Sequence, residues 1–343
     1  MGEIVLRRLG LMLVTMFIVS LTVFMISELV PEDIARNVLG QFASPSALQN
    51  FREQNGLLCS PVVRYVIWLG GDGWVGPARN VLGPGIIAPD CNPPKLARAG
   101  LLRGDLGYSM QNGMQVAPLL FRRLGNSAVL AGLAFVFIMP VALLLGLAAG
   151  LKEGSIVDRV ITLFSLITTS SPTFALGALM VVVLSIQLHL LPGISALTSE
   201  SNVLQNPLKL IMPMLCLFFA EAGYVARITR ASMVEVMASP YIRTAVLKGL
   251  PYWTVVFRHA MKNALLAPIT VIMLHIGWLL GGIVVVETMF GYPGIGTLLL
   301  QSTLTKDVPV IEAGTLFLTF VATSTQLLAD LTYTYLNPRI RYK

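Results

Sequence analysis

The segment YIRTAVLKGLPYWTVVFRHAMKNAL, from Tyr241 to Leu265, lies between two long apolar runs and contains no acidic residue. Gly249 and Pro251 interrupt it. Glycine suits the left-handed residue that ends a helix, and proline cannot continue one. The segment therefore predicts a helix over 231–248, a sharp turn, and a second helix that begins at Pro251 and leads into the next apolar run. Its basic side chains are Arg243, Lys248, Arg258, His259 and Lys262.

The composition indicates a polytopic membrane protein. The chain has 343 residues, of which 55% are hydrophobic and only 12% charged, and its mean hydropathy is +0.76. Soluble domains carry roughly 25% charged residues. A net charge of +7 would also suit nucleic-acid binding, but Lys and Arg gather at the ends of apolar runs, as in membrane proteins. We therefore expect contact with membrane lipid and no nucleic-acid partner.

Long apolar runs predict the fold class. A helix needs about 20 apolar residues to cross a bilayer. The first run follows Arg7 and Arg8, and its alternative interpretation is a cleaved signal peptide. Its length and the absence of a small-residue cleavage site favour a retained span. We expect an all-α membrane protein with six transmembrane helices at Leu9–Ser27, Leu124–Leu151, Val160–Leu188, Leu210–Ala226, Ala264–Val286 and Ala313–Leu336.

The distribution of Lys and Arg predicts that both termini are cytoplasmic, because the short outer loops hold only Lys209 and Lys306. We divide the chain into a cytoplasmic end with the first span (1–30), a large extracytoplasmic loop (31–123) and a core (124–343). The core includes a cytoplasmic segment at about 228–263. The extracytoplasmic loop is rich in Gly and Pro, so we expect turns rather than regular helices in it.

Three cysteines occur in the chain. Cys59 and Cys91 both lie in the large loop, and they would form a disulfide if that loop faces an oxidising compartment. Two separate free thiols are the alternative. Cys216 lies in an apolar run, where packing is the simplest role. None has the spacing of a zinc or redox pair, and no paired-histidine motif is present, so we expect no metal site.

Ionisable residues inside a membrane are costly and often functional. Glu221 could form a buried pair with Arg227 or line a translocation path. His275 is either a packing residue or a ligand-contacting one. Glu287, at the outer end of the fifth span, could be an anchor or gate, or a solvated helix end. We expect a structural role for Asp330.

The short helix before Gly249 has an apolar face. Ile242, Ala245 and Val246 share this face at helical spacing, which suits docking into a groove of another protein. On this interpretation, Ala245→Arg would abolish docking while the chain still folds and inserts. The alternative is a basic interfacial loop that touches anionic lipid.

These segments resemble the permeases of ABC importers, in the dipeptide and oligopeptide branch. The general coupling motif of these permeases, E-A-A-x-x-x-G-x9-I-x-L-P, is matched here only at Ala245 and Gly249. The branch's own pattern, Y-[IV]-R-T-A-x-x-K-G-L followed by H-A-x-x-N-A-L, matches at Tyr241–Leu250 and His259–Leu265. Four further matches occur in the same order as in the branch: GDLGYS (Gly104–Ser109), SSPTFALG (Ser170–Gly177), ETMFGYPGIGTLL (Glu287–Leu299) and DLTYTYLNPRIR (Asp330–Arg341).

The resemblance implies a type I importer permease in a bacterial inner membrane that carries peptides or peptide-like solutes. It implies a second homologous permease, two cytoplasmic ATPases and an extracytoplasmic substrate-binding protein as partners. The chain itself would bind no cofactor and would not be catalytic alone, because ATP and Mg²⁺ belong to the ATPases. The exact solute stays open among dipeptides, oligopeptides, glutathione, nickel complexes and opines. The resemblance assigns ATPase coupling to Tyr241, Ile242, Arg243, Thr244, Ala245, Lys248 and Gly249.

Two rival functions remain from the residues alone. An ion-coupled secondary transporter would show paired ionisable groups or broken helices in two related halves, and no such halves are evident. A membrane-embedded enzyme would use Glu221 and His275 as acid and base, but no local catalytic motif accompanies them.

Overall fold

The computed structural model describes residues 2–29, 34–40, 42–75, 77–78, 87, 91, 99–195 and 203–336. Most of the Gly- and Pro-rich stretch and the basic C-terminal residues 337–343 lie outside this range. The regular structure of the described residues is helical, with one isolated bridge between Tyr108 and Gln115. The chain divides into two compact units, Met1–Leu124 with Leu298–Phe320, and Gly125–Thr297 with Val321–Lys343.

Four helices of the described chain are long and apolar enough to cross a membrane. They are α1 (Gly2–Leu29), α6 (Val116–Leu151), α9 (Leu208–Met237) and α15 (Val308–Leu336). Three bent helix pairs raise the number of candidate spans to at most seven. The all-α membrane fold is therefore confirmed, and the spans differ from the prediction mainly where a helix is broken.

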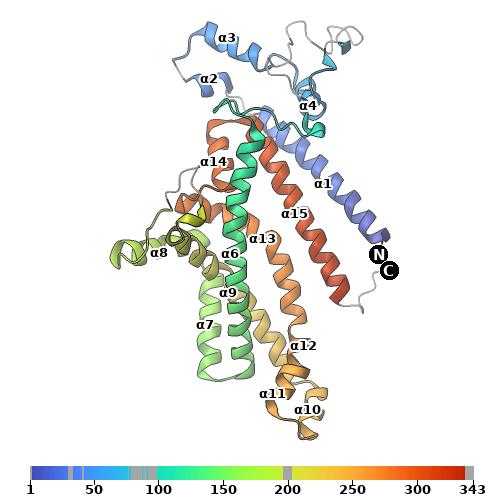
Figure 1. Cartoon of the computed structure of the whole chain (residues 1–343), viewed down its shortest axis with the longest axis vertical. Helices are drawn as coiled ribbons and strands as arrows, with labels where there is room; N and C mark the ends of the chain where they lie inside the picture. Colours follow the sequence, from blue (N-terminus) through green and yellow to red (C-terminus); the bar gives the residue numbers. More distant parts are fainter. Residues whose placement is uncertain are drawn as a thin grey trace. The chain divides into compact units, whose positions relative to one another are not determined.

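The third predicted span is not one helix. α7 (Ile156–Ser170) is followed by α8 (Thr173–Met180) and the π-helical turn η2 (Val181–Gln187), and the two parts meet at 108°. Figure 1 shows α8 leaving the direction of α7. Ser171, between them, has an extended backbone with ψ 131°. A residue before proline avoids the helical region, so Pro172 explains the break.

The fifth span also has a different shape from the prediction. The short helices α11 (Tyr252–Thr254), η4 (Val255–Ala260) and α12 (Met261–Ala264) lead at 45° into α13 (Leu266–Phe290). Gly291 ends α13 with a φ of 60°, in the left-handed region that glycine tolerates. α14 (Ile295–Thr305), which was not predicted, then departs at 75°.

The large loop contains helices where turns were expected. They are α2 (Ile34–Leu39), α3 (Pro45–Gln54), α4 (Pro61–Gly70) and the single turn η1 (Leu101–Arg103). α3 and α4 each begin with proline after a serine, a sequence that favours helix initiation. The prediction failed because Gly and Pro content was averaged over the whole loop, whereas these prolines stand at helix starts.

A disulfide between Cys59 and Cys91 closes the core of this loop. Val63 and Ile67 of α4 pack in the same buried cluster. The other face of α4 contacts α1, because Tyr65 lies 5.1 Å from the ring of Phe24 and its hydroxyl is 2.8 Å from that of Ser20. The first helix is thus attached to the large loop.

α9 is the central element of the second unit, in which it contacts α7, α8 and α13. Close approach depends on glycine. A Cβ at Gly146 of α6 would lie 2.5 Å from the Ala226 carbonyl oxygen, and one at Gly223 of α9 would lie 2.1 Å from Oγ1 of Thr168. Interfaces of small residues allow membrane helices to pack closely.

We predict that Gly146→Ala destabilises the chain, because the new methyl group meets backbone that cannot move aside. Overpacking of this kind costs roughly 1–3 kcal/mol. Gly132→Ala on the same helix is the matched control, since a Cβ there meets nothing within 4 Å. Thermal unfolding in detergent should show a lower midpoint for the first variant only. Equal midpoints would contradict the close packing of α6 on α9.

Candidate functional site

The basic segment, defined here as residues 238–265, begins about ten residues later than the segment predicted at about 228–263, because α9 continues to Met237. α9 ends at Met237, and a separate helix, α10, runs from Pro240 to Leu247. The expected helix over 231–248 is therefore divided at Ser239, whose backbone is extended with ψ 148° because Pro240 follows it. Gly249, with a φ of 72°, makes the expected turn after α10.

The apolar face of α10 points inward, which corrects the predicted docking face. Ile242 and Ala245 are only 2% and 7% exposed, and they pack in one cluster with Val255, Val256 and Ala260. This contact folds α10 back onto the start of the fifth span. Ala245→Arg would therefore place a charge in a small core rather than test docking.

The opposite face of α10 is open. Leu247 is 82% exposed and Tyr241 42%. Val246, which was predicted to share the face of Ile242 and Ala245, is also exposed, at 57%. Arg243, Thr244, Lys248 and Gly249 are exposed on the same segment. The Tyr241 hydroxyl also accepts a hydrogen bond from the Asn263 amide at 2.9 Å, which joins α10 to α12. The segment thus presents apolar side chains among basic ones, supported by a packed inner face.

A second candidate site is an open cavity of about 360 Å³ in the second unit. Glu221 of α9 and His275 of α13 meet in its wall, with His275 Nδ1 2.7 Å from Glu221 Oε2. Of the two alternatives for Glu221, the buried pair with Arg227 is wrong, since His275 is the partner. Arg227 instead lies over the ring of Tyr224, 5.9 Å from its centroid. The remaining lining residues are Thr169, Ala220, Tyr224 and Leu274.

Glu287 is part of the framework rather than a solvated helix end. It is 0% exposed, and its carboxylate accepts hydrogen bonds from the Ser127 hydroxyl and, at 2.7 Å, from the Gly296 N–H. A Cβ at Gly294 would lie 1.9 Å from Glu287 Oε1, so only glycine fits beside it. The buried carboxylate therefore shapes the turn between α13 and α14.

Two further bonds support the same turn. The Tyr292 hydroxyl donates to the Asn126 carbonyl oxygen at 2.7 Å, and the Asn126 amide donates to the Pro293 carbonyl oxygen at 2.9 Å. Hydrogen bonds thus connect the turn within the Glu287–Leu299 motif to Asn126, at the start of the predicted second span. No local pattern in the sequence indicated this connection.

An ion pair that was not predicted from the sequence joins α7 to α9. Arg230 donates to Asp158 through Nε and, at 2.8 Å, through Nη2. Asp158 also accepts from the Gly154 N–H at 2.9 Å, and Ser155 caps the helix by accepting from the Asp158 N–H. The sequence S-x-x-D at Ser155–Asp158 is a helix-start signal that could have drawn attention to this carboxylate.

Asp330, for which a structural role was expected, accepts from the Gln326 amide at 3.4 Å, one helical turn earlier. In the first unit, Ser109 at the end of the GDLGYS motif donates to Asp307, whose other oxygen accepts from the Met110 N–H at 3.0 Å. Asp307 was not singled out from the sequence. This bond attaches the motif to the start of α15.

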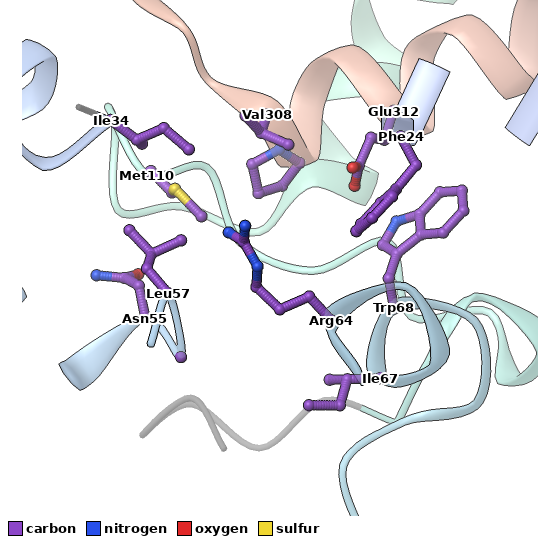
Figure 2. A pocket seen from close by; sticks show the side chains of 12 residues that line it. Phe24, Ile34, Asn55, Leu57, Arg64, Ile67, Trp68, Met110, Val308 and Glu312 are labelled. Carbon is purple, nitrogen blue, oxygen red and sulfur yellow. The ribbon is translucent and has the colours of Figure 1, made fainter. Parts of the chain in front are cut away.

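The first unit holds a much smaller cavity, of about 40 Å³, which has room for a few water molecules. Figure 2 shows Arg64 of α4 pointing into it, with Phe24, Trp68 and Glu312 on one side. Burial lowers the pKa of Arg64, and the Glu312 carboxylate opposes that shift. The small volume of this cavity fits a structural water site better than a solute site.

Comparison with known proteins covers the whole chain. Residues 142–342 match the family described as the binding-protein-dependent transport system inner membrane component, and residues 1–131 match the N-terminal region of the same systems. A probable peptide ABC transporter permease of Sinorhizobium fredii is 32% identical over 342 residues, with 100% of both chains covered.

Two other relatives have the same coverage or nearly so. The glutathione transport system permease protein GsiC of Escherichia coli is 32% identical, with 99% of each chain covered. The oligopeptide transport system permease protein AppB of Bacillus subtilis is 29% identical, with 100% of each chain covered. The match includes the basic segment, the cavity and the turn beside Glu287, and on this basis the chain belongs to the family of binding-protein-dependent transport system inner membrane components.

Proposed function

We propose that the chain is a permease subunit of an ATP-driven importer for peptides or peptide-like solutes. The observation that carries the proposal is the similarity, along the full length, to peptide, oligopeptide and glutathione permeases. Family membership also decides against the secondary transporter and the membrane enzyme. We place the chain in a bacterial inner membrane with both termini cytoplasmic, in agreement with the distribution of Lys and Arg.

The proposed complex contains a second homologous permease, two cytoplasmic ATPases and an extracytoplasmic substrate-binding protein. ATP and Mg²⁺ would be bound by the ATPases. Energy would enter this chain as a movement of the basic segment. An importer of this kind alternates between two states, and a partner shifts the equilibrium only if it binds the two states differently.

The exposed face of α10 is the part of the chain best suited to receive an ATPase. Leu247 and Val246 would provide apolar contacts, and Arg243 and Lys248 would surround them with charge. Interfaces commonly have an apolar centre and a polar rim. Ile242 and Ala245 would contribute indirectly, by fixing α10 to η4, which leads into α13, so that a movement of α10 reaches the membrane helices.

The cavity beside Glu221 and His275 is the candidate segment of the translocation path. Its wall belongs to α7, α9 and α13, and it is open on one side. We propose that a second permease closes this side in the assembled transporter. Glu287 would instead keep the α13–α14 turn rigid.

Affinity purification tests the proposed complex. The chain, tagged at its C-terminus and extracted from native membranes in mild detergent, should co-purify with a second permease and ATP-hydrolysing subunits identified by mass spectrometry. Vesicles holding this complex should take up solute only with ATP and the binding protein. A chain that transports after reconstitution by itself would contradict the proposal.

We predict that Leu247→Asp lowers ATP-dependent uptake at least tenfold while the chain stays folded, because the charge falls at the centre of the docking face. Leu102→Asp is the matched control, since Leu102 is 80% exposed in the extracytoplasmic loop and Leu247 is 82% exposed. Uptake and ATPase co-purification should both fall for the first variant only. Normal co-purification with Leu247→Asp would remove the docking assignment.

Ala245→Arg should behave differently from Leu247→Asp. Because Ala245 packs among Ile242, Val255 and Val256, we expect a lower thermal midpoint and reduced levels in the membrane. The cost of placing an unpaired charge in a core is several kcal/mol. Wild-type stability of this variant, measured by thermal unfolding in detergent, would show that α10 does not pack inward.

A further inference from the structure

We propose that the cavity beside Glu221 binds the protonated amino group of a solute as it passes through the chain. This inference rests on the proposed function and adds a recognised chemical group to it. A protonated amino group is common to peptides of every sequence. A subsite for the amino group would let one path carry many solutes, because it would not recognise their side chains.

The first argument is the unused acceptor capacity of Glu221. The side chain is 4% exposed, and its Oε2 is engaged by His275 Nδ1 at 2.7 Å. When Glu221 is ionised it only accepts hydrogen bonds, and the imidazole is then the donor in this pair. Among the described residues, no hydrogen bond reaches the second oxygen, Oε1. A carboxylate held by one oxygen in a cavity wall can accept an ammonium group with the other.

The second argument is the aromatic surface beside the carboxylate. The rings of Tyr224 and His275 lie 5.1 Å apart, and both line the cavity. The guanidinium of Arg227 already lies 5.9 Å from the centre of the Tyr224 ring. Aromatic faces attract cations through their quadrupole. A cation in the cavity would therefore meet a carboxylate and an aromatic face together, while Arg227 opposes its approach.

The third argument is size. Pockets for small ligands typically measure about 300–1,000 Å³, and this cavity measures about 360 Å³. It can hold the end of a peptide-like solute but not a long peptide. Thr169 of α7 supplies a hydroxyl in the wall, and Ala220 and Leu274 supply apolar surface. A single polar end group among apolar walls is consistent with recognition of a terminus.

Charged thiol reagents test this inference without knowledge of the solute. Cys59 and Cys91 are bonded to each other, and Cys216 is buried, so a Cys216→Ala background has no accessible thiol among the described residues. Ala220→Cys then places one thiol in the cavity wall. In the purified complex, the rate of modification of this thiol is measured with a cationic reagent, a trimethylammonium methanethiosulfonate, and with an anionic one, a sulfonate methanethiosulfonate. Each rate is divided by the rate of the same reagent with a small free thiol in solution. The ratio of the cationic to the anionic normalised rate is the cation preference.

We expect the cationic reagent to be favoured roughly tenfold, since one nearby charge in a low-dielectric site is worth at least that much. Glu221→Gln should remove the preference, Glu221→Asp should retain it, and Arg227→Gln should increase it. At Asn112→Cys, in the extracytoplasmic loop, none of these changes should alter the ratio. If Glu221→Gln fails to fold, the ratio measured at Ala220→Cys with Glu221 unchanged still decides the question.

A ratio of one or less at Ala220→Cys, or a ratio unchanged by Glu221→Gln, would overturn the inference. ATP-dependent uptake is measured separately on the same complex. Loss of the cation preference with ATP-dependent uptake intact would remove only the amino-group subsite, whereas uptake that needs no ATP would contradict the proposed function.

Discussion

The close packing of α9 against its neighbours is the constraint on which the second unit depends. Glycines at Gly146 and Gly150 of α6 and at Gly223 of α9 let backbones approach where any side chain would collide. Without a hydrophobic force between helices in lipid, such packing supplies much of their association. α9 therefore serves as a continuous rod that joins the Glu221 cavity to the basic segment. Its Met233 already belongs to the cluster that holds α10.

Two pairs of ionisable side chains connect α9 to neighbouring helices at different points along its length. Arg230 and Asp158 join α9 to α7 near the C-terminal end of α9, and Glu221 and His275 join α9 to α13 beside the cavity. Each of these four side chains has an ionisable partner, as is usual for ionisable groups inside a membrane. The second pair lines a cavity of ligand size in the part of the chain that the structure describes. This contrast separates a structural pair from a functional candidate on geometry rather than on residue type.

Periodicity and helix-ending residues carried much of the prediction. Long apolar runs located α1, α6, α9 and α15 because the bilayer thickness sets their length. Gly249 marked a turn because its left-handed backbone is a local property. The break before Pro172 follows from the same local chemistry, but the surrounding apolar residues hid it.

Tertiary contacts account for what the sequence could not predict. Ile242 and Ala245 form an apolar face. From the sequence, such a face can be covered either by a partner protein or by another part of the same chain. The fold shows that it packs on Val255 and Val256. Likewise, Glu221 has Arg227 close in sequence and His275 far away, and the packing of α13 on α9 selects His275. Ser127 lies 160 residues from Glu287, so no motif could reveal their bond.

Site-directed photocrosslinking tests the central claim that the exposed face of α10 binds an ATP-hydrolysing subunit. A benzophenone amino acid is placed at Leu247 and, separately, at Ile242 in the assembled complex. The account predicts a crosslink from Leu247 to an ATP-hydrolysing subunit, and crosslinks from Ile242 only within the chain. A crosslink to that subunit from Ile242 and none from Leu247 would contradict it.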